Sequence, residues 1–332
     1  GSLSDNSTAS NNTAVGFNAL NLNTTGADNN AFGSGSLDAN TTGGDNNAFG
    51  KDALGVNTTG GANTAMGHVA LDANTTGDNN TAIGRAALSA NTTASNNTAV
   101  GYNALLVNTT GTGNTAIGTA ALDANTTANF NTAVGYLSLT ANTTGTENAS
   151  FGRASLNANT TGNYNTGLGT NALANNTTAN SNTGIGSNAL GANTTGGNNT
   201  AVGRGSYGNS TTGHSNCGLG YEAGHAITTG SENVHIGFRA GDHSVAHATG
   251  SGNVIIGAFS DAGATDTAQA IVLGYDVTGS ASTTTLGSGS SDIRTNHGST
   301  SWATVSDKRV KKDIEDAEAG LSFINDLRPR TF

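Results

Sequence analysis

A repeat with a period of 17 runs through most of this 332-residue chain and limits the folds that the chain can adopt. A Gly preceded by a large apolar residue recurs at position 16, 33, 50 and so on to 237, which is 13 steps of 17 without a slip. The consensus unit is Asn-Thr-Ala-Φ-Gly-x-x-Ala-Leu-x-x-Asn-Thr-Thr-Gly-x-x, where Φ is large and apolar. A short fixed period of this kind is typical of solenoids, in which each repeat packs only on its neighbours.

The unit is too short for a pair of helices, because helical repeats need about 33 residues or more. Thr-Ala-Φ-Gly alternates as a strand does, and the Thr-rich segment also favours extended structure. The sequence therefore predicts an all-β fold, a parallel β-solenoid or β-roll with one 17-residue coil per repeat. Coils stacked at about 4.8 Å over this length give a rod of roughly 60 Å.

Equivalent residues of successive coils should form columns along this rod. We name them the Φ column (Val15 to Ile236), the Ala column (from Ala14), the Leu column (Leu20 to Leu190, then Tyr207, Gly224 and Gly241) and two Asn columns (Asn12 to Asn233, and Asn23 to Asn193). We expect the Φ and Leu columns to lie inside and the Asn side chains to bond from coil to coil. The small residues of the Ala column would then face outward and let copies of the chain pack together as a homo-oligomer.

Charge and composition exclude several classes of function. Residues 1–305 hold six Lys and Arg against 16 Asp and Glu, so this body carries the whole net charge of −10. Phosphate binding needs several cations, so neither nucleic acid nor an anionic membrane is an expected partner, and no apolar run is long enough for membrane insertion. Carboxylates do not recur in facing pairs or at calcium-binding spacings, which predicts no cofactor and no metal. His235, in the Ala column, is the one position where an axial oligomer would bring histidines together.

The Asn-Thr-Ala-Val-Gly and Asn-Thr-Ala-Ile-Gly coils resemble the repeats of trimeric autotransporter adhesin heads, and similar repeats occur in bacteriophage tail fibres. The resemblance covers residues 11–243, although the repeat is longer than the usual adhesin unit. It implies a homotrimer with a left-handed β-roll. Residues 1–10 are interpreted as a leader with a cloning scar.

After Gly237 the Φ-Gly pair recurs at steps of 20, 17 and 13, at Ile256-Gly257, Leu273-Gly274 and Leu286-Gly287. Terminal repeats of solenoids are commonly atypical, because they cover an open sheet edge. We interpret residues 244–304 as an irregular cap and neck.

Residues 305–332 have a different chemistry. Apolar residues at 310, 314, 317, 321 and 324 predict a short amphipathic helix that begins at Ser306. Ser306-Asp307-Lys308-Arg309-Val310-Lys311-Lys312-Asp313-Ile314 resembles the start of the endosialidase-type intramolecular chaperone of phage tailspikes. That resemblance implies self-cleavage after Val305, with Ser306 as nucleophile and Lys311 as its partner. The matching segment is short, so we expect the chaperone to be incomplete here.

Together these features predict a structural rod of a phage tail fibre or tailspike, which is matured with a C-terminal chaperone and located on the virion. Its expected partners are two copies of itself and a receptor or glycan on the host surface. The alternatives are a trimeric adhesin on a bacterial cell surface, an ice-binding solenoid with outward Thr residues, and a glycan-degrading tailspike. A binding determinant would lie at variable positions such as Lys51, Arg85, Tyr102, Tyr136 and Arg153.

Overall fold

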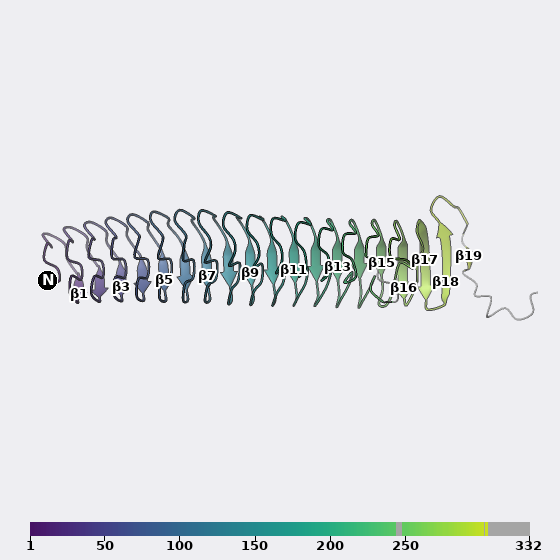
Figure 1. Cartoon of the computed structure of the whole chain (residues 1–332), viewed down its shortest axis with the longest axis horizontal. Helices are drawn as coiled ribbons and strands as arrows, with labels where there is room; N and C mark the ends of the chain where they lie inside the picture. Colours follow the sequence, from purple (N-terminus) through teal and green to yellow (C-terminus); the bar gives the residue numbers. More distant parts are fainter. Residues whose placement is uncertain (244–247, 302, 305–332) are drawn as a thin grey trace, which may run out of the picture.

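The computed structural model describes residues 1–243, 248–301 and 303–304, and these form an elongated rod of stacked coils (Figure 1). Nearly every coil contributes one three-residue strand, and the strands lie in a single row along the rod. The described residues contain no α-helix. The strands are Thr13–Val15 (β1), Asn30–Phe32 (β2), Asn47–Phe49 (β3), Thr64–Met66 (β4), Thr81–Ile83 (β5), Thr98–Val100 (β6), Thr115–Ile117 (β7), Thr132–Val134 (β8), Ala149–Phe151 (β9), Thr166–Leu168 (β10), Thr183–Ile185 (β11), Thr200–Val202 (β12), Cys217–Leu219 (β13), Val234–Ile236 (β14), Val254–Ile256 (β15), Ile271–Tyr275 (β16), Thr283–Ser288 (β17), Ser291–Asn296 (β18) and Ala303–Thr304 (β19).

The predicted parallel β-solenoid is confirmed by the strand pairing. From β1 to β14 each strand pairs in parallel with the next one, in a register of exactly one repeat, as in Thr81↔Thr98. From β14 to β17 the register follows the altered spacing of the Φ-Gly pairs and places Gly274 opposite Gly287. The Φ-Gly pairs that follow the regular repeats therefore continue the same parallel ladder.

The parallel ladder ends at β17, where the chain reverses. β17 pairs antiparallel with β18, and β18 pairs antiparallel with β19. Gly289, in the turn between β17 and β18, has a left-handed φ of 58° that suits Gly. The hairpin covers one edge of the solenoid, and an open edge would expose unpaired backbone groups.

The core of each coil contains the Leu column, as predicted, but its second column is Ala and not Φ. The Leu column is fully buried, as expected, but it packs against the Ala column and not against the Φ column. Ala82, for example, is completely buried, whereas its neighbour Ile83 is 38% exposed. A 17-residue coil is narrow, so the strand turns its small Ala side chain inward, and alternation places Φ outside. The prediction that copies of the chain pack through the Ala column is therefore wrong.

Apart from Asn12 in the first coil, both Asn columns are buried, and they form the predicted ladders. In the second column, Asn40 Nδ2 donates to Oδ1 of Asn23 at 2.8 Å and to the Gly43 carbonyl at 2.9 Å. In the first column, the backbone N–H of Asn46 donates to Oδ1 of Asn29 at 3.0 Å. These buried amides thus find partners both along the ladder and within the coil, which offsets the cost of burying them, and Asn193, whose Oδ1 has no partner, is an exception.

The recurrent Gly after each Φ is required by backbone geometry. Gly84 has a φ of +133°, a conformation that side chains with a Cβ rarely adopt, and an added Cβ would lie 2.5 Å from the carbonyl oxygen of Gly101. The same close approach repeats in neighbouring coils. Close stacking of the coils therefore explains why this column contains only Gly.

Candidate functional site

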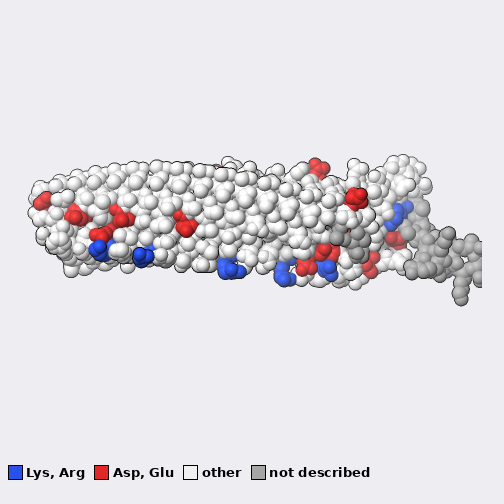
Figure 2. All heavy atoms as spheres, in the orientation of Figure 1, with Lys and Arg blue, Asp and Glu red and all other residues white. Residues whose placement is uncertain are grey.

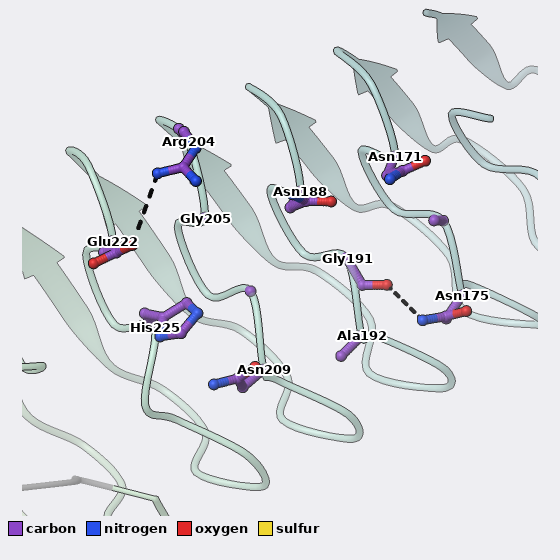
Figure 3. A pocket seen from close by; sticks show the side chains of 12 residues that line it. Asn171, Asn175, Asn188, Gly191, Ala192, Arg204, Gly205, Asn209, Glu222 and His225 are labelled. Carbon is purple, nitrogen blue, oxygen red and sulfur yellow. Dashed lines mark hydrogen bonds and ion pairs between the residues drawn. The ribbon is translucent and has the colours of Figure 1, made fainter. Parts of the chain in front are cut away.

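A groove opens on the surface of the rod along the coils of β10 to β13 (Figure 3). It has a volume of about 550 Å³ and lies on the turn segment that follows each strand, not on the strands. Its lining residues are Asn171, Ala174, Asn175, Asn188, Gly191, Ala192, Arg204, Gly205, Gly208, Asn209, Glu222 and His225.

The groove exists because small residues replace larger ones at one position of the repeat. Ala174, Gly191 and Gly208 follow one another at steps of one repeat, and each stands directly after the residue of the Leu column. Other coils have Leu106 or Asp123 at this position. Three consecutive coils with a small residue here leave a hollow parallel to the rod axis.

Amide side chains supply much of the polar surface of the groove. Asn171 and Asn188 occupy the same position of two adjacent coils, and Asn175 and Asn209 share another position. Asn175 Nδ2 donates to the carbonyl oxygen of Gly191 at 2.9 Å, which holds that side chain against the wall of the groove. An amide presents both donors and acceptors, so this lining suits a ligand that offers both.

Charged side chains close the end of the groove nearest β13 and form a network. Arg204 Nη1 lies 4.0 Å from Glu222 Oε1, and Glu222 Oε2 lies 3.6 Å from Nε of Arg239. Asp242 Oδ2 lies 3.7 Å from Nη2 of Arg239 and 3.7 Å from Nδ1 of His225. Figure 2 shows acidic and basic atoms gathered together in this part of the rod.

Asp242 is the most buried member of this network, with its side chain 16% exposed. Burial raises the pKa of the Asp242 carboxyl above its ordinary value, and the neighbouring His225 and Arg239 oppose that rise. These two neighbours therefore offset only part of the desolvation cost. The network is close to charge balance, with Arg204 and Arg239 facing Glu222 and Asp242.

A row of aromatic side chains continues from the network toward the C-terminal end. Tyr221 stacks on Phe238 with ring centroids 5.0 Å apart, and Phe238 meets the edge of Phe259 at 5.2 Å. Phe259 in turn meets Tyr275 at 5.9 Å. The Arg204 guanidinium joins the groove to this row, because it lies over the Tyr221 ring and donates to the Tyr221 hydroxyl at 2.8 Å.

The variable positions expected to carry binding lie in one exposed column, directly after the recurrent Gly. Within it Arg85 lies over the ring of Tyr102, 5.5 Å from its centroid, and Tyr136 is 53% exposed. The Lys and Arg atoms accordingly follow one edge of the rod (Figure 2). The same column continues at Arg204, Tyr221 and Phe238. Following the column beyond Arg153 in steps of 17 residues would therefore have identified the charged and aromatic part of the site from the sequence.

Other expected site residues are placed differently or lie outside the described residues. His235 is fully buried within its own coil, so copies of the chain cannot bring several such histidines together. Val305, Ser306 and Lys311, and the helix expected over residues 305–332, lie outside the described residues. Among the residues that the structure describes, no group of three His, Cys, Asp or Glu side chains could hold a metal ion.

No family model, curated protein or solved structure matches this chain in comparisons with known proteins. In the described ranges there is also no helix with the length and apolar character needed to cross a membrane.

Proposed function

We propose that this chain forms the structural rod of a trimeric, surface-facing fibre, namely a phage tail fibre or tailspike directed toward a host surface. The observation that carries this proposal is the exposure of the Φ column. Most of its large apolar side chains are exposed, from Val15 at 56% to Leu219 at 50%, and the others, such as Val134, are half-buried. Monomeric soluble proteins rarely expose a contiguous apolar surface of this length.

A second and a third copy of the chain fit this surface best. The strands that carry the Φ column lie in a single row along the rod, so identical rods packed side by side would bury this column over much of its length. The resemblance to adhesin heads favours three copies in a left-handed β-roll, and closed cyclic symmetry leaves no further copy to add. A trimeric adhesin on a bacterial surface would use the same rod.

Substitutions on two faces test this self-association. We expect light scattering after gel filtration to give about three times the 32.6 kDa of one chain. Ile83→Asp with Ile117→Asp adds charge to the Φ column and should give a monomer, because burying those charges is costly. Thr76→Asp with Thr110→Asp, at exposed positions seven residues before each Ile, should leave the trimer intact. A monomeric wild type would overturn the proposal.

Processing by a C-terminal chaperone is a separate part of this proposal. It rests on the resemblance around Ser306, with the scissile bond after Val305. Mass spectrometry of the gene product expressed with a complete chaperone should detect a chain that ends at Val305. Ser306→Ala and Lys311→Ala should abolish that product, and an uncleaved wild-type chain would remove processing from the proposal.

Ice binding is a second candidate, and one feature of the surface favours it. The second Thr of Asn-Thr-Thr is exposed in every coil from Thr25 to Thr229, while the first Thr bonds to the next coil, as Thr24 Oγ1 does to the Thr41 carbonyl at 2.9 Å. These Thr residues form a regular outward ladder at the coil spacing. Thermal hysteresis at micromolar protein would support this candidate, and its absence would remove it.

A further inference from the structure

We propose that the groove along β10 to β13, together with the aromatic row beyond it, binds a neutral oligosaccharide that lies along the rod axis. This inference rests on the proposed surface-facing role, since it names the chemistry that such a rod would recognise. Sugar binding and oligomeric state are measured in separate experiments, so the sugar site and the trimeric rod can each be rejected independently of the other.

The repeat gives the groove a regular spacing. Coils stack at about 4.8 Å, a distance comparable to the length of one pyranose unit. Asn171 and Asn188 present the same amide one coil apart, and Ala174, Gly191 and Gly208 leave the same space in three successive coils. A linear polymer of similar units would therefore meet equivalent groups coil after coil.

The polar groups of the groove match the hydroxyls of a sugar. Each hydroxyl is at once a donor and an acceptor, and the Asn amides offer both functions. At the closed end Arg204 offers donors and Glu222 offers acceptors, and the ring of His225 faces the same space (Figure 3). Ligands that offer acceptors alone, such as phosphates or sulfates, would use only half of this lining.

The aromatic row supplies the apolar contact that sugars also need. Phe238 is 45% exposed and Tyr275 is 57% exposed, so their rings present accessible surface next to polar groups. The C–H face of a pyranose can pack on such a ring, much as other apolar groups do. Stacking of Tyr221 on Phe238, with Arg204 over Tyr221, fixes the first rings of this row before any ligand arrives.

The charges favour a neutral ligand over an anionic one. Each of the two Arg side chains at the site faces a carboxylate, so neither is available as a free cation for a polyanion. The chain as a whole carries a net charge of −10, which adds long-range repulsion of anions. We therefore assign the site to uncharged hexose or N-acetylhexosamine units.

Saturation-transfer NMR followed by calorimetry tests this assignment on the full chain. The probes are maltohexaose, cellohexaose, mannohexaose and chitohexaose, with a heparin hexasaccharide as the anionic control. We expect at least one of the four neutral probes to bind and heparin to give no signal. The assignment is overturned if none of the four neutral probes binds, or if heparin alone does.

Matched variants locate the binding. Ala192→Phe fills the groove, whereas Ala141→Phe places the same side chain at the equivalent position of a coil outside the groove. Arg204→Ala removes the residue that joins groove and aromatic row, and Arg153→Ala is its counterpart three coils earlier. We expect Ala192→Phe and Arg204→Ala each to weaken binding about tenfold or more, equivalent to about 1.4 kcal/mol, and the two controls to bind as wild type. Unchanged binding in both test variants would overturn the location. Light scattering on the same samples reports the oligomeric state independently.

Discussion

The hydroxyl of Tyr207 lies 2.7 Å from Nδ1 of His235, inside the solenoid and fully shielded from solvent. Tyr207 occupies the Leu column and His235 occupies the Ala column two coils further on. Burial raises the pKa of Tyr207 well above its ordinary value, so the phenol stays protonated and can act as a donor. The pair places two polar rings in the Leu and Ala columns, which elsewhere hold mostly Leu and Ala with an occasional Ser such as Ser150.

Glycines next to this pair compensate for the size of its rings. The Leu column has Gly224 and Gly241 in the two coils that follow Tyr207. A Cβ at Gly224 would lie 2.7 Å from the Tyr207 ring and 2.7 Å from Nδ1 of His235. The loss of Leu from the repeat in these coils is therefore coupled to the gain of Tyr and His.

Removing the Tyr207 hydroxyl should destabilise the rod locally. We expect Tyr207→Phe to lower the free energy of unfolding by about 1 kcal/mol, because a buried hydrogen bond is lost. Urea unfolding measures this, with Tyr136→Phe, on an exposed ring, as the control. Equal stability of Tyr207→Phe and wild type would show that the hydrogen bond contributes nothing to stability.

Restoring the consensus Leu at position 224 should be harmful unless the two rings are also removed. Gly224→Leu alone drives a side chain into Tyr207 and His235, and overpacking of this kind costs about 3 kcal/mol. Adding Tyr207→Leu and His235→Ala should recover most of the loss, as judged by thermal unfolding. A stable Gly224→Leu single variant would contradict the size compensation.

The recurrent Gly should not tolerate even a methyl group. Gly84→Ala would meet both the positive φ and the carbonyl of Gly101, and strain in such a backbone conformation alone costs about 1–3 kcal/mol. Gly55→Ala is a matched control, because Gly55 lacks a positive φ and Ala174 occupies the same repeat position. If both variants unfolded at the same temperature, close stacking of the coils would not be the reason for the Gly column.

Asp72 predicts a pH dependence of stability. Burial raises the pKa of its carboxyl above the ordinary 3.8, and the nearby Asp52 adds to the rise. The charged form is therefore less favourable in the folded chain, and the contribution of Asp72 to stability falls as pH rises through the raised pKa. We expect Asp72→Asn to melt higher than wild type at pH 7 and to lose that advantage near pH 3.8. Asp45→Asn, at an exposed position, controls for loss of charge, and an advantage that persisted at low pH would contradict this origin.

The sequence was sufficient to predict the coil period, the parallel stacking and the Asn ladders, because each follows from strict repetition. It was not sufficient to predict which side of the strand faces inward. The alternation in Thr-Ala-Φ-Gly places Φ and Ala on opposite faces of the strand, but it does not say which face points inward. The larger Φ is the expected core residue, because burial of large apolar side chains usually dominates. The narrow coil holds only Ala82 beside its Leu, so Ile83 is left outside.

The candidate site was harder to predict than the fold, because it depends on small departures from the repeat at its variable positions. In the sequence Gly191 and Gly208 do not stand out, because the chain is rich in Gly. They line a groove only because three successive coils stack with a small residue at the same position. Likewise Glu222 and Arg239 are one full repeat apart in sequence, and the coil register brings them into contact.

Copies of this rod are proposed to associate through the Φ column. Double electron–electron resonance measures this association most directly, with spin labels on Ile117→Cys or on Thr110→Cys. Both variants carry Cys217→Ser, since Cys217 is a free cysteine. We expect dipolar coupling between copies, with clearly shorter distances from position 117 than from position 110. No coupling at either position, or shorter distances from position 110, would contradict this association.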